Sequence, residues 1–267
     1  MLSRLPVFIP IAKPPWTKLG KKLESQCRKA LLEFSLIDNC QKIAVALSGG
    51  KDSLTLLYLL HAIQGNGFPP IQIVAIHIYG EFSCGPKIGL SFLEKICDQL
   101  HIPLVTKEIQ QDLKSLSCYA CSRKRRKMIF TLAKELGVTT VAFGHHREDS
   151  IQTLLLNLLH KAEFAANLPK VPMQRYGITI IRPLIYITEA DIIAFATLYR
   201  FARISCQCRI GQSSKRQEVK QLLIQIESLF PNARKNLMQA ALKYGSKKAL
   251  TLLSLIHISE PTRLGMI

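Results

Sequence analysis

The feature that most constrains the fold is a regular alternation of short apolar runs with amphipathic segments. The apolar runs lie at residues 42–47, 71–78, 103–109, 139–143 and 178–184. Segments with the apolar spacing of helices lie around them, at residues 18–37, 54–63, 89–100, 122–136 and 151–160. Strands that alternate with helices in this way are typical of a parallel sheet. We therefore predict an α/β fold with a five-stranded parallel sheet, helices on both faces and a helical C-terminal part.

The first apolar run leads directly into the sequence Ser48-Gly-Gly-Lys-Asp-Ser53. A glycine-rich turn between a strand and a helix is typical of an anion site, because backbone N–H groups and the helix N-terminus face the ligand. Ser48 and Ser53 can donate hydroxyl hydrogen bonds, Lys51 adds a cation, and Asp52 could hold Mg²⁺. The spacing is neither Gly-x4-Gly-Lys-Ser/Thr nor Gly-x-Gly-x-x-Gly. The alternative is an ordinary strand-to-helix turn with an N-cap.

The chain is strongly basic, with 36 Lys and Arg residues, 18 Asp and Glu residues and a formal net charge of +18. A globular protein with this charge usually binds a polyanion. An anionic membrane surface is the rival partner, but we find no helix that divides cleanly into a basic and an apolar face. The candidate nucleic-acid tracks are Lys18, Lys21, Lys22, Arg28 and Lys29, and the basic run at residues 123–127. A solvated helix face is the alternative interpretation of that run.

Eight cysteines are present, and the proline-broken N-terminus makes a poor signal peptide, so we expect reduced thiols. Cys118 and Cys121 form a Cys-x-x-Cys pair. Such a pair fits half a zinc site, a redox dithiol or two ligands of an iron–sulfur cluster. Cys206 and Cys208 can supply further ligands. We interpret the remaining four as small apolar residues, namely Cys27, Cys40, Cys84 and Cys97.

Four features occur in order along the chain. They are Ser-Gly-Gly-Lys-Asp-Ser at 48–53, Cys-Tyr-Ala-Cys-Ser-Arg-Lys-Arg-Arg at 118–126, Gly-His-His-Arg-Glu-Asp at 144–149 and a cysteine near position 206. Together they resemble the tRNA-cytidine(32) 2-sulfurtransferase family of the PP-loop N-type ATP pyrophosphatases. The resemblance runs from about Lys18 to Tyr244. It implies a Rossmann-like fold of the adenine nucleotide alpha hydrolase type. It also implies ATP-dependent thiolation of tRNA at C2 of an anticodon-loop cytidine, through an adenylated base.

The resemblance also implies which residues bind the nucleotide. The loop that would bind ATP comprises Ser48, Gly49, Gly50, Lys51, Asp52 and Ser53. Backbone at Ile76, His77 and Gly144 would hold adenosine, although a structural hydrogen bond is the alternative role for His77. Lys51, Asp52 and Asp149 are the implied catalytic residues, with Asp149 as a contact to Mg²⁺ or ATP. His145 and His146 would contact substrate or act as a general acid, or else serve only in capping and packing.

The resemblance further implies a [4Fe–4S] cluster held by Cys118, Cys121 and Cys206, with its fourth iron open for sulfide. Cys208 follows one residue earlier than the family's spacing, so it competes with Cys206 as the third ligand. The implied partners are tRNA and a sulfur donor such as a cysteine desulfurase, in the cytoplasm and without a membrane. A homodimer is left open beside a monomer. The family's Asp-Asp pair after the two histidines is Glu148-Asp149 here, which keeps the charge and changes the reach.

Two rivals to this function remain. One is a PP-loop sulfurtransferase that acts on a tRNA uridine, and the other is a zinc-stapled RNA-binding module without catalysis. We expect an N-terminal arm and basic helix at residues 1–37, a PP-loop ATP pyrophosphatase domain at 38–190 and a helical region with the third cluster cysteine at 191–252. Residues 253–263 resemble the in-frame translation of a transposase-type sequencing adapter, so we interpret 253–267 as an artefact.

Overall fold

The computed structural model describes residues 9, 11–80, 87–110, 118–201 and 215–245. The helices are α1 (Lys18–Glu33), α2 (Lys51–Ile63), α3 (Lys87–Gln99), α4 (Cys118–Glu135), α5 (Arg147–Lys161), α6 (Glu189–Leu198), α7 (Lys215–Leu229) and α8 (Ala233–Tyr244). The strands are β1 (Lys42–Ala46), β2 (Gln72–Tyr79), β3 (Leu104–Glu108), β4 (Thr140–Ala142), β5 (Lys170–Met173) and β6 (Ile178–Ile181). A short 3-10 helix, η2 (Gln174–Tyr176), joins the last two strands.

The strands form one sheet in the order β3-β2-β1-β4-β6-β5. The five strands expected from the apolar runs pair in parallel, which confirms that part of the prediction. The sixth strand, β5, pairs antiparallel with β6 at the edge, so the predicted five-stranded sheet is one strand too small. This strand has four residues and contains Pro172, which cannot donate to a ladder and is tolerated at an edge. Such a segment gives no recognisable strand pattern in the sequence.

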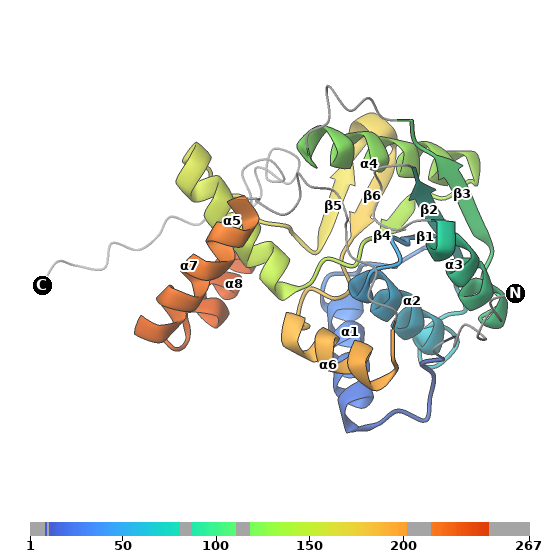
Figure 1. Ribbon diagram of the computed structural model, residues 1–267, viewed down its shortest axis with the longest axis horizontal. Helices are drawn as coiled ribbons and strands as arrows, with labels where there is room; N and C mark the ends of the chain where they lie inside the picture. Colours follow the sequence, from blue (N-terminus) through green and yellow to red (C-terminus); the bar gives the residue numbers. More distant parts are fainter. Residues whose placement is uncertain (1–8, 10, 81–86, 111–117, 202–214, 246–267) are drawn as a thin grey trace, which may run out of the picture.

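Alternate side chains of the central strands enter two apolar cores. On β1, Ile43 and Val45 belong to the core that includes residues of α1, α2, α3 and α6. Ala44, between them, belongs to the core under α4, together with Phe130 and Val141. Figure 1 shows α4 on one side of the sheet and α1, α2 and α6 on the other. The prediction of helices on both faces is therefore confirmed.

Three helices begin about one turn earlier than their apolar spacing predicts. Helix α2 begins at Lys51 instead of residue 54, α4 at Cys118 instead of 122, and α5 at Arg147 instead of 151. In each case the added first turn contains polar or motif residues that contribute little to the apolar period. Carboxylates in a first turn are favourable beside the positive end of the helix dipole. The motif residues therefore lie in the first turns of helices.

The predicted helical C-terminal part is confirmed by α6, α7 and α8. Helices α7 and α8 contact α5 and lie to one side of the sheet in Figure 1. Helix α6 instead contacts α2 and α1, and its Ile192 and Phe195 are fully buried in the main core. The regional boundaries at residues 37, 190 and 252 stay predictions. In the described part of the chain, none of the helices combines the length and the apolarity that crossing a membrane requires.

Candidate active site

The loop Ser48–Ser53 connects the carboxyl end of β1 to α2 and is closed by hydrogen bonds of its own side chains. The Ser53 hydroxyl accepts from the backbone N–H of Ser48 at 3.2 Å and donates to the carbonyl of Gly50 at 3.0 Å. The hydroxyls of Ser48 and Ser53 lie 3.0 Å apart, and the backbone N–H of Gly50 donates to Ser48 Oγ at 3.3 Å. Ser53 is buried, so these bonds fix the turn from inside.

Two glycines give this loop its shape. Gly49 has φ = +84°, a conformation that residues with a Cβ rarely adopt. Gly144, at the carboxyl end of β4, lies directly against the first turn of α2. A Cβ at Gly144 would approach the backbone of Asp52 and the nitrogen of Ser53 to 2.9 Å. The predicted nucleotide-binding residue Gly144 therefore has a demonstrable structural role, which is close packing of β4 on the loop helix.

Lys51 and Asp52 lie in the first turn of α2 and contact each other. Lys51 Nζ donates to Asp52 Oδ1 at 2.8 Å, and it lies 3.9 Å from Glu189 Oε1 in the first turn of α6. Both Lys51 and Asp52 have about a third of their side chains exposed, so both are accessible to a ligand. The two implied catalytic residues of the loop are thus adjacent, beside an acidic residue that the sequence analysis did not single out.

The start of α5 brings Asp149 to the carboxyl ends of the strands, where the loop 48–53 also lies. His146 is the N-cap, and its backbone N–H donates to Asp149 Oδ2 at 3.1 Å. Its buried ring links the two motifs, because Nε2 lies 3.4 Å from Asp149 Oδ2 and 3.8 Å from Asp52 Oδ1. The structure therefore places Asp52 and Asp149 beside one imidazole, and Lys51 contacts Asp52.

Glu148 is buried beneath this group with a complete set of partners. Its Oε1 accepts from Arg147 Nη2 at 2.8 Å, and its Oε2 accepts from the backbone N–H of Glu189 at 2.8 Å. Burial disfavours the charge of both Glu148 and His146, which lie 3.4 Å apart through Oε2 and Nδ1. The attraction between the two groups, together with their neighbours, has a larger effect on both pKa values than burial has. The pKa of Glu148 falls to about 2, and the pKa of His146 is raised by Glu148, Asp149 and Asp52.

His145 has the opposite electrostatic environment. Burial and the cations of Arg182, Arg126 and Arg216 hold its pKa well below the usual value. Its Nδ1 accepts a hydrogen bond from Arg182 Nε at 3.3 Å, and its ring stacks on Phe143. A neutral imidazole with an occupied Nδ1 carries its proton on Nε2. His145 is therefore a neutral hydrogen-bond donor in a cationic surrounding, whereas the carboxylates around His146 raise its pKa and favour its protonated form.

His77 and Ile76 lie on β2 and fix the exit of β1. The backbone N–H of Leu47 donates to the carbonyl of Ile76 at 2.9 Å, and the carbonyl of Leu47 accepts from His77 Nδ1 at 2.7 Å. Burial and then the cation of Arg125 lower the pKa of His77, although its hydrogen bond to Leu47 acts in the opposite direction. This structural hydrogen bond is the alternative role given above for His77. The implied contact of Ile76 and His77 with adenosine stays a prediction.

Of the three predicted cluster ligands, the described residues include the side chain of Cys121. Cys118 and Cys121 occupy the first turn of α4, not the residues before it, and positions three apart in a helix share one face. Cys121 is half-buried, while the side chain of Cys118 and all of Cys206 and Cys208 lie outside the described residues. Burial raises the pKa of Cys27 and Cys97 to about 12, in agreement with their interpretation as apolar residues.

Cys40 is half-buried and its sulfur lies 3.3 Å from Thr140 Oγ1, whereas Cys84 lies outside the described residues. No group of three or more metal-ligating side chains is assembled within the described ranges. Mg²⁺ usually binds through one or two carboxylates plus substrate phosphates, so Asp52 and Asp149 fit it as partial ligands.

The predicted basic tracks differ in how far their charges are neutralised. On α1, Lys22 pairs with Asp191 at 2.8 Å, and Arg28 pairs with Glu24 at 2.6 Å. Lys18 and Lys21 are exposed on the same helix. On α4, Arg126 lies over the ring of Phe143 at 6.0 Å, close to the candidate site. Arg126 therefore lies near the candidate site, whereas Lys22 and Arg28 of the α1 track form ion pairs.

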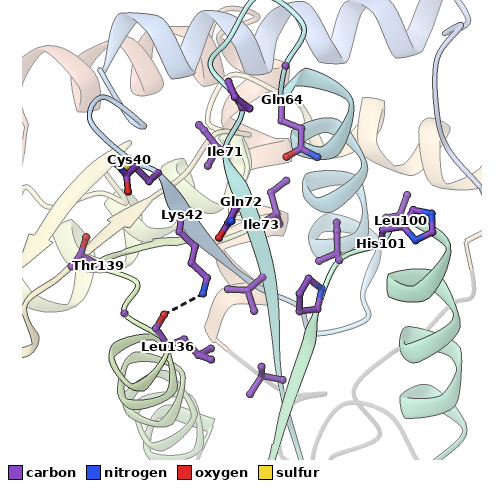
Figure 2. Close-up of a pocket in the computed structure, with 18 of the residues that line it drawn as sticks. Cys40, Lys42, Gln64, Ile71, Gln72, Ile73, Leu100, His101, Leu136 and Thr139 are labelled. Carbon is purple, nitrogen blue, oxygen red and sulfur yellow. Dashed lines mark hydrogen bonds between the residues drawn. The ribbon is translucent and has the colours of Figure 1, made fainter.

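A groove of about 1200 Å³ lies at the opposite edge of the sheet, at the amino ends of β1 and β2 (Figure 2). Lys42 Nζ donates to the carbonyl of Leu136 at 3.2 Å across its wall, and Gln72 and His101 also line it. In parallel sheets ligands bind beyond the carboxyl ends of the strands. The groove therefore does not belong to the loop site.

Four charged residues at the site were missed by the sequence reasoning, namely Arg182, Glu189, Arg216 and Lys220. Arg182 is 5% exposed and follows β6 in the sequence Ile-Arg-Pro-Leu, which marked the resemblance without suggesting a role. Arg216 Nη1 lies 3.3 Å from Asp149 Oδ1, and Lys220 Nζ lies 2.8 Å from Glu189 Oε2. Both cations belong to an amphipathic helix whose packing could not be derived from its own sequence.

Comparison with known proteins places this arrangement in a family. The family of the PP-loop domain matches residues 19–227. A tRNA-cytidine(32) 2-sulfurtransferase of Xanthomonas euvesicatoria pv. vesicatoria is 35% identical over 234 residues, which cover 84% of this chain and 75% of that protein. The protein of the same name from Nitrosospira multiformis is 33% identical over 233 residues, with coverages of 84% and 77%.

A solved structure shares the fold. It is the U34-tRNA thiolase NcsA from Methanococcus maripaludis with its [4Fe-4S] cluster, with a TM-score of 0.69 and 21% sequence identity. The alignment covers 93% of this chain and 86% of that chain. By the identity and coverage of its sequence relatives and the PP-loop match, the chain belongs to the tRNA-cytidine(32) 2-sulfurtransferase family of PP-loop proteins.

Proposed function

We propose that this protein is an ATP-dependent tRNA sulfurtransferase that replaces O2 of a cytidine in the anticodon loop by sulfur. The observation that carries the proposal is the convergence of Lys51, Asp52 and Asp149 beside a closed glycine-rich loop. A loop of this kind at a helix N-terminus binds phosphates. The named relatives, more than 30% identical, supply the substrate class.

In the first step, O2 of the cytidine attacks the α-phosphorus of ATP. The bond from the α-phosphorus to the bridging oxygen breaks, and pyrophosphate leaves. Backbone N–H groups of residues 48–53 and the ammonium of Lys51 stabilise the charge that develops on the leaving phosphates. Asp52 and Asp149 would hold Mg²⁺, which supplies further neutralisation of that charge. Ile76, His77 and Gly144 border the proposed adenosine position.

In the second step, a sulfur nucleophile attacks C2 and AMP leaves with the former O2. Cys118, Cys121 and Cys206 would hold a [4Fe–4S] cluster, which supplies an open iron site for that sulfur. The chain's own contribution is supported by the position of Cys121 in the first turn of α4. There the positive end of the helix dipole offsets the negative charge of a cluster held by cysteines.

The tRNA would bind through exposed cations around this edge. Its anticodon loop can present an unstacked base to the site. Arg126 of the run at residues 123–127 lies near the site, and Lys18 and Lys21 extend the basic surface. Affinity for tRNA should fall steeply as the salt concentration rises. A desulfurase as sulfur donor, a cytoplasmic location and a homodimer belong to this proposal as expectations.

The test is anaerobic purification followed by thiolation of tRNA with ATP and a sulfide source, read out by mass spectrometry of nucleosides. We expect 2-thiocytidine, with about four irons and four sulfides per chain. Cys121→Ala should lose the iron and the product, whereas the control Cys40→Ala should keep both. Stoichiometric zinc in place of iron would contradict the proposal in favour of a zinc-stapled RNA-binding module. A 2-thiouridine product would reassign the substrate.

A further inference from the structure

Helix α7 reaches the loop site through two cations. Arg216 Nη1 lies 3.3 Å from Asp149 Oδ1. One turn later, Lys220 Nζ contacts Glu189 Oε2 at 2.8 Å, and the other oxygen of Glu189 lies 3.9 Å from Lys51 Nζ. Both carboxylates belong to the candidate active site. The C-terminal region therefore contributes charge to a site otherwise built from the sheet and its first helices.

The Arg216 contact is not needed to hold α7 in place. Val219 and Leu223 are buried and attach α7 through apolar contacts, and α7 also contacts α5 and α8. The Arg216 side chain is 49% exposed, and an ion pair this accessible contributes little to stability. Asp149 is likewise held from its other oxygen by the backbone N–H of His146. A role in the site explains the placement of this arginine better than a role in folding.

The guanidinium of Arg216 retains the capacity to bind an anion. Arginine has five N–H donors, and within the described residues Arg216 uses one of them, at a distance longer than a strong charge-assisted bond. Its cation also contributes to the lowered pKa of His145, so it lies close to the end of β4. At that end Gly144 packs against the loop helix. The guanidinium thus lies beside the polyphosphate position proposed above.

The charges around the loop also favour anion binding by Arg216. The carboxylates of Asp52, Asp149 and Glu189 would repel a polyphosphate unless cations offset them. Lys51 is shared between Asp52 and Glu189, and so offsets only part of that charge. A fork-shaped guanidinium matches phosphate oxygens better than an ammonium does. Arg216 is an accessible arginine that contacts Asp149, an implied catalytic carboxylate.

We propose that Arg216 is a phosphate-binding residue of the ATP site, supplied by the C-terminal region. Asp149 aims the guanidinium at the loop, and its remaining donors bind the β- and γ-phosphates. The ligand class is a nucleoside triphosphate or its pyrophosphate product. Lys220 acts as a positioning residue, because it holds Glu189 beside Lys51. This inference rests on ATP binding in the proposed function and is independent of tRNA thiolation.

The test measures binding of ATP and of inorganic pyrophosphate to the full chain by isothermal titration calorimetry, with Mg²⁺ present. Arg216→Gln should weaken both by about 10- to 100-fold, the effect of losing a hydrogen bond to a charged group. Arg216→Lys should recover part of the loss. Lys215→Gln is the matched control. It removes one charge from the same turn, where Lys215 pairs with exposed Glu218, and should bind within about twofold of wild type.

The outcomes separate this inference from the proposed function. If wild type binds ATP and Arg216→Gln binds it equally well or more tightly, Arg216 is only a counter-ion of Asp149 and the inference is wrong. If Lys215→Gln loses as much affinity as Arg216→Gln, the effect is one of net charge and the inference is equally wrong. If wild type fails to bind ATP, the proposed function falls together with it. Thermal denaturation of each variant verifies that the fold is intact.

Discussion

Glu148→Gln should cost several kcal/mol of stability, although Gln has nearly the shape of Glu. Glu148 is 5% exposed and accepts hydrogen bonds from Arg147 and from the backbone of Glu189. A glutamine would turn an NH₂ group toward one of these donors. Burial alone would raise the pKa of Glu148, but His146, Arg147 and the Glu189 backbone lower it from 4.5 to about 2. That shift corresponds to about 3 kcal/mol in favour of the folded state.

The pH dependence of this contribution follows from the direction of the shift. Because the folded-state pKa lies below the unfolded value, the contribution is present above a pH of about 5 and is lost as the pH falls toward 2. About half of it remains at pH 3. Urea denaturation should therefore give a difference of about 3 kcal/mol between wild type and Glu148→Gln at pH 7, and a smaller one in acid. A scan at pH 7 should show a Tm lower by roughly 6–12 °C.

Two further measurements make this prediction sharper. The control Glu218→Gln removes a carboxylate that pairs with Lys215 at an exposed site, and should change stability by less than about 1 kcal/mol. In Glu148→Gln the pKa of His146 should fall, because burial then opposes its charge with one carboxylate fewer. A difference below about 1 kcal/mol at pH 7, or one that stays constant into acid, would refute the electrostatic reasoning.

Three other predictions concern the loop and the basic surface. Gly144→Ala should destabilise the fold by about 1–3 kcal/mol or more, because its Cβ would press on the backbone of α2, whereas a Cβ at Gly50 meets only Ser48 Oγ at 3.5 Å. Equal denaturation curves for Gly144→Ala and Gly50→Ala would contradict this. Ser53→Ala removes the acceptor of the Ser48 N–H, so it should lower the stability measured by urea denaturation by about 1–3 kcal/mol and weaken ATP binding. Unchanged stability and affinity would count against the described structure of the loop. Lys21→Gln should lower the salt dependence of tRNA binding by about one ion, and Lys22→Gln should change it less because Asp191 already pairs with Lys22.

The parts of the fold that were predictable are those in which local pattern and tertiary role coincide. The central parallel strands β1, β2, β4 and β6 are short runs of mostly apolar and buried residues, which are typical of strands covered on both faces. The strand β5 could not be found in this way, because an edge strand of four residues that contains Pro172 is too short to give a recognisable pattern. The first turns of α2, α4 and α5 could not be predicted for a related reason. Their residues are mostly polar, so they do not show the apolar spacing of a helix.

The candidate site was predictable as far as its motifs extend along the chain. The loop 48–53 and Asp149 could be named from the sequence. In the structure, Asp52 of the loop and Asp149 both lie beside the buried imidazole of His146. Glu189, Arg216 and Lys220 could not be named, because each is an ordinary charged residue in the first two turns of α6 or α7. Their function depends on which helix packs where, and that follows from long-range contacts.

Glu148 contributes to stability and is also connected to the residues of the candidate active site. It binds the first residue of α6, Glu189, which lies between Lys51 of the loop and Lys220 of α7. Glu148 is thus linked to Lys51 through Glu189, although its buried carboxylate need not touch the substrate. The Glu148 carboxylate bonds both Arg147 and the Glu189 backbone, and so connects the start of α5 to the start of α6. Groups that are connected in this way before ATP binds meet the requirement of electrostatic preorganisation.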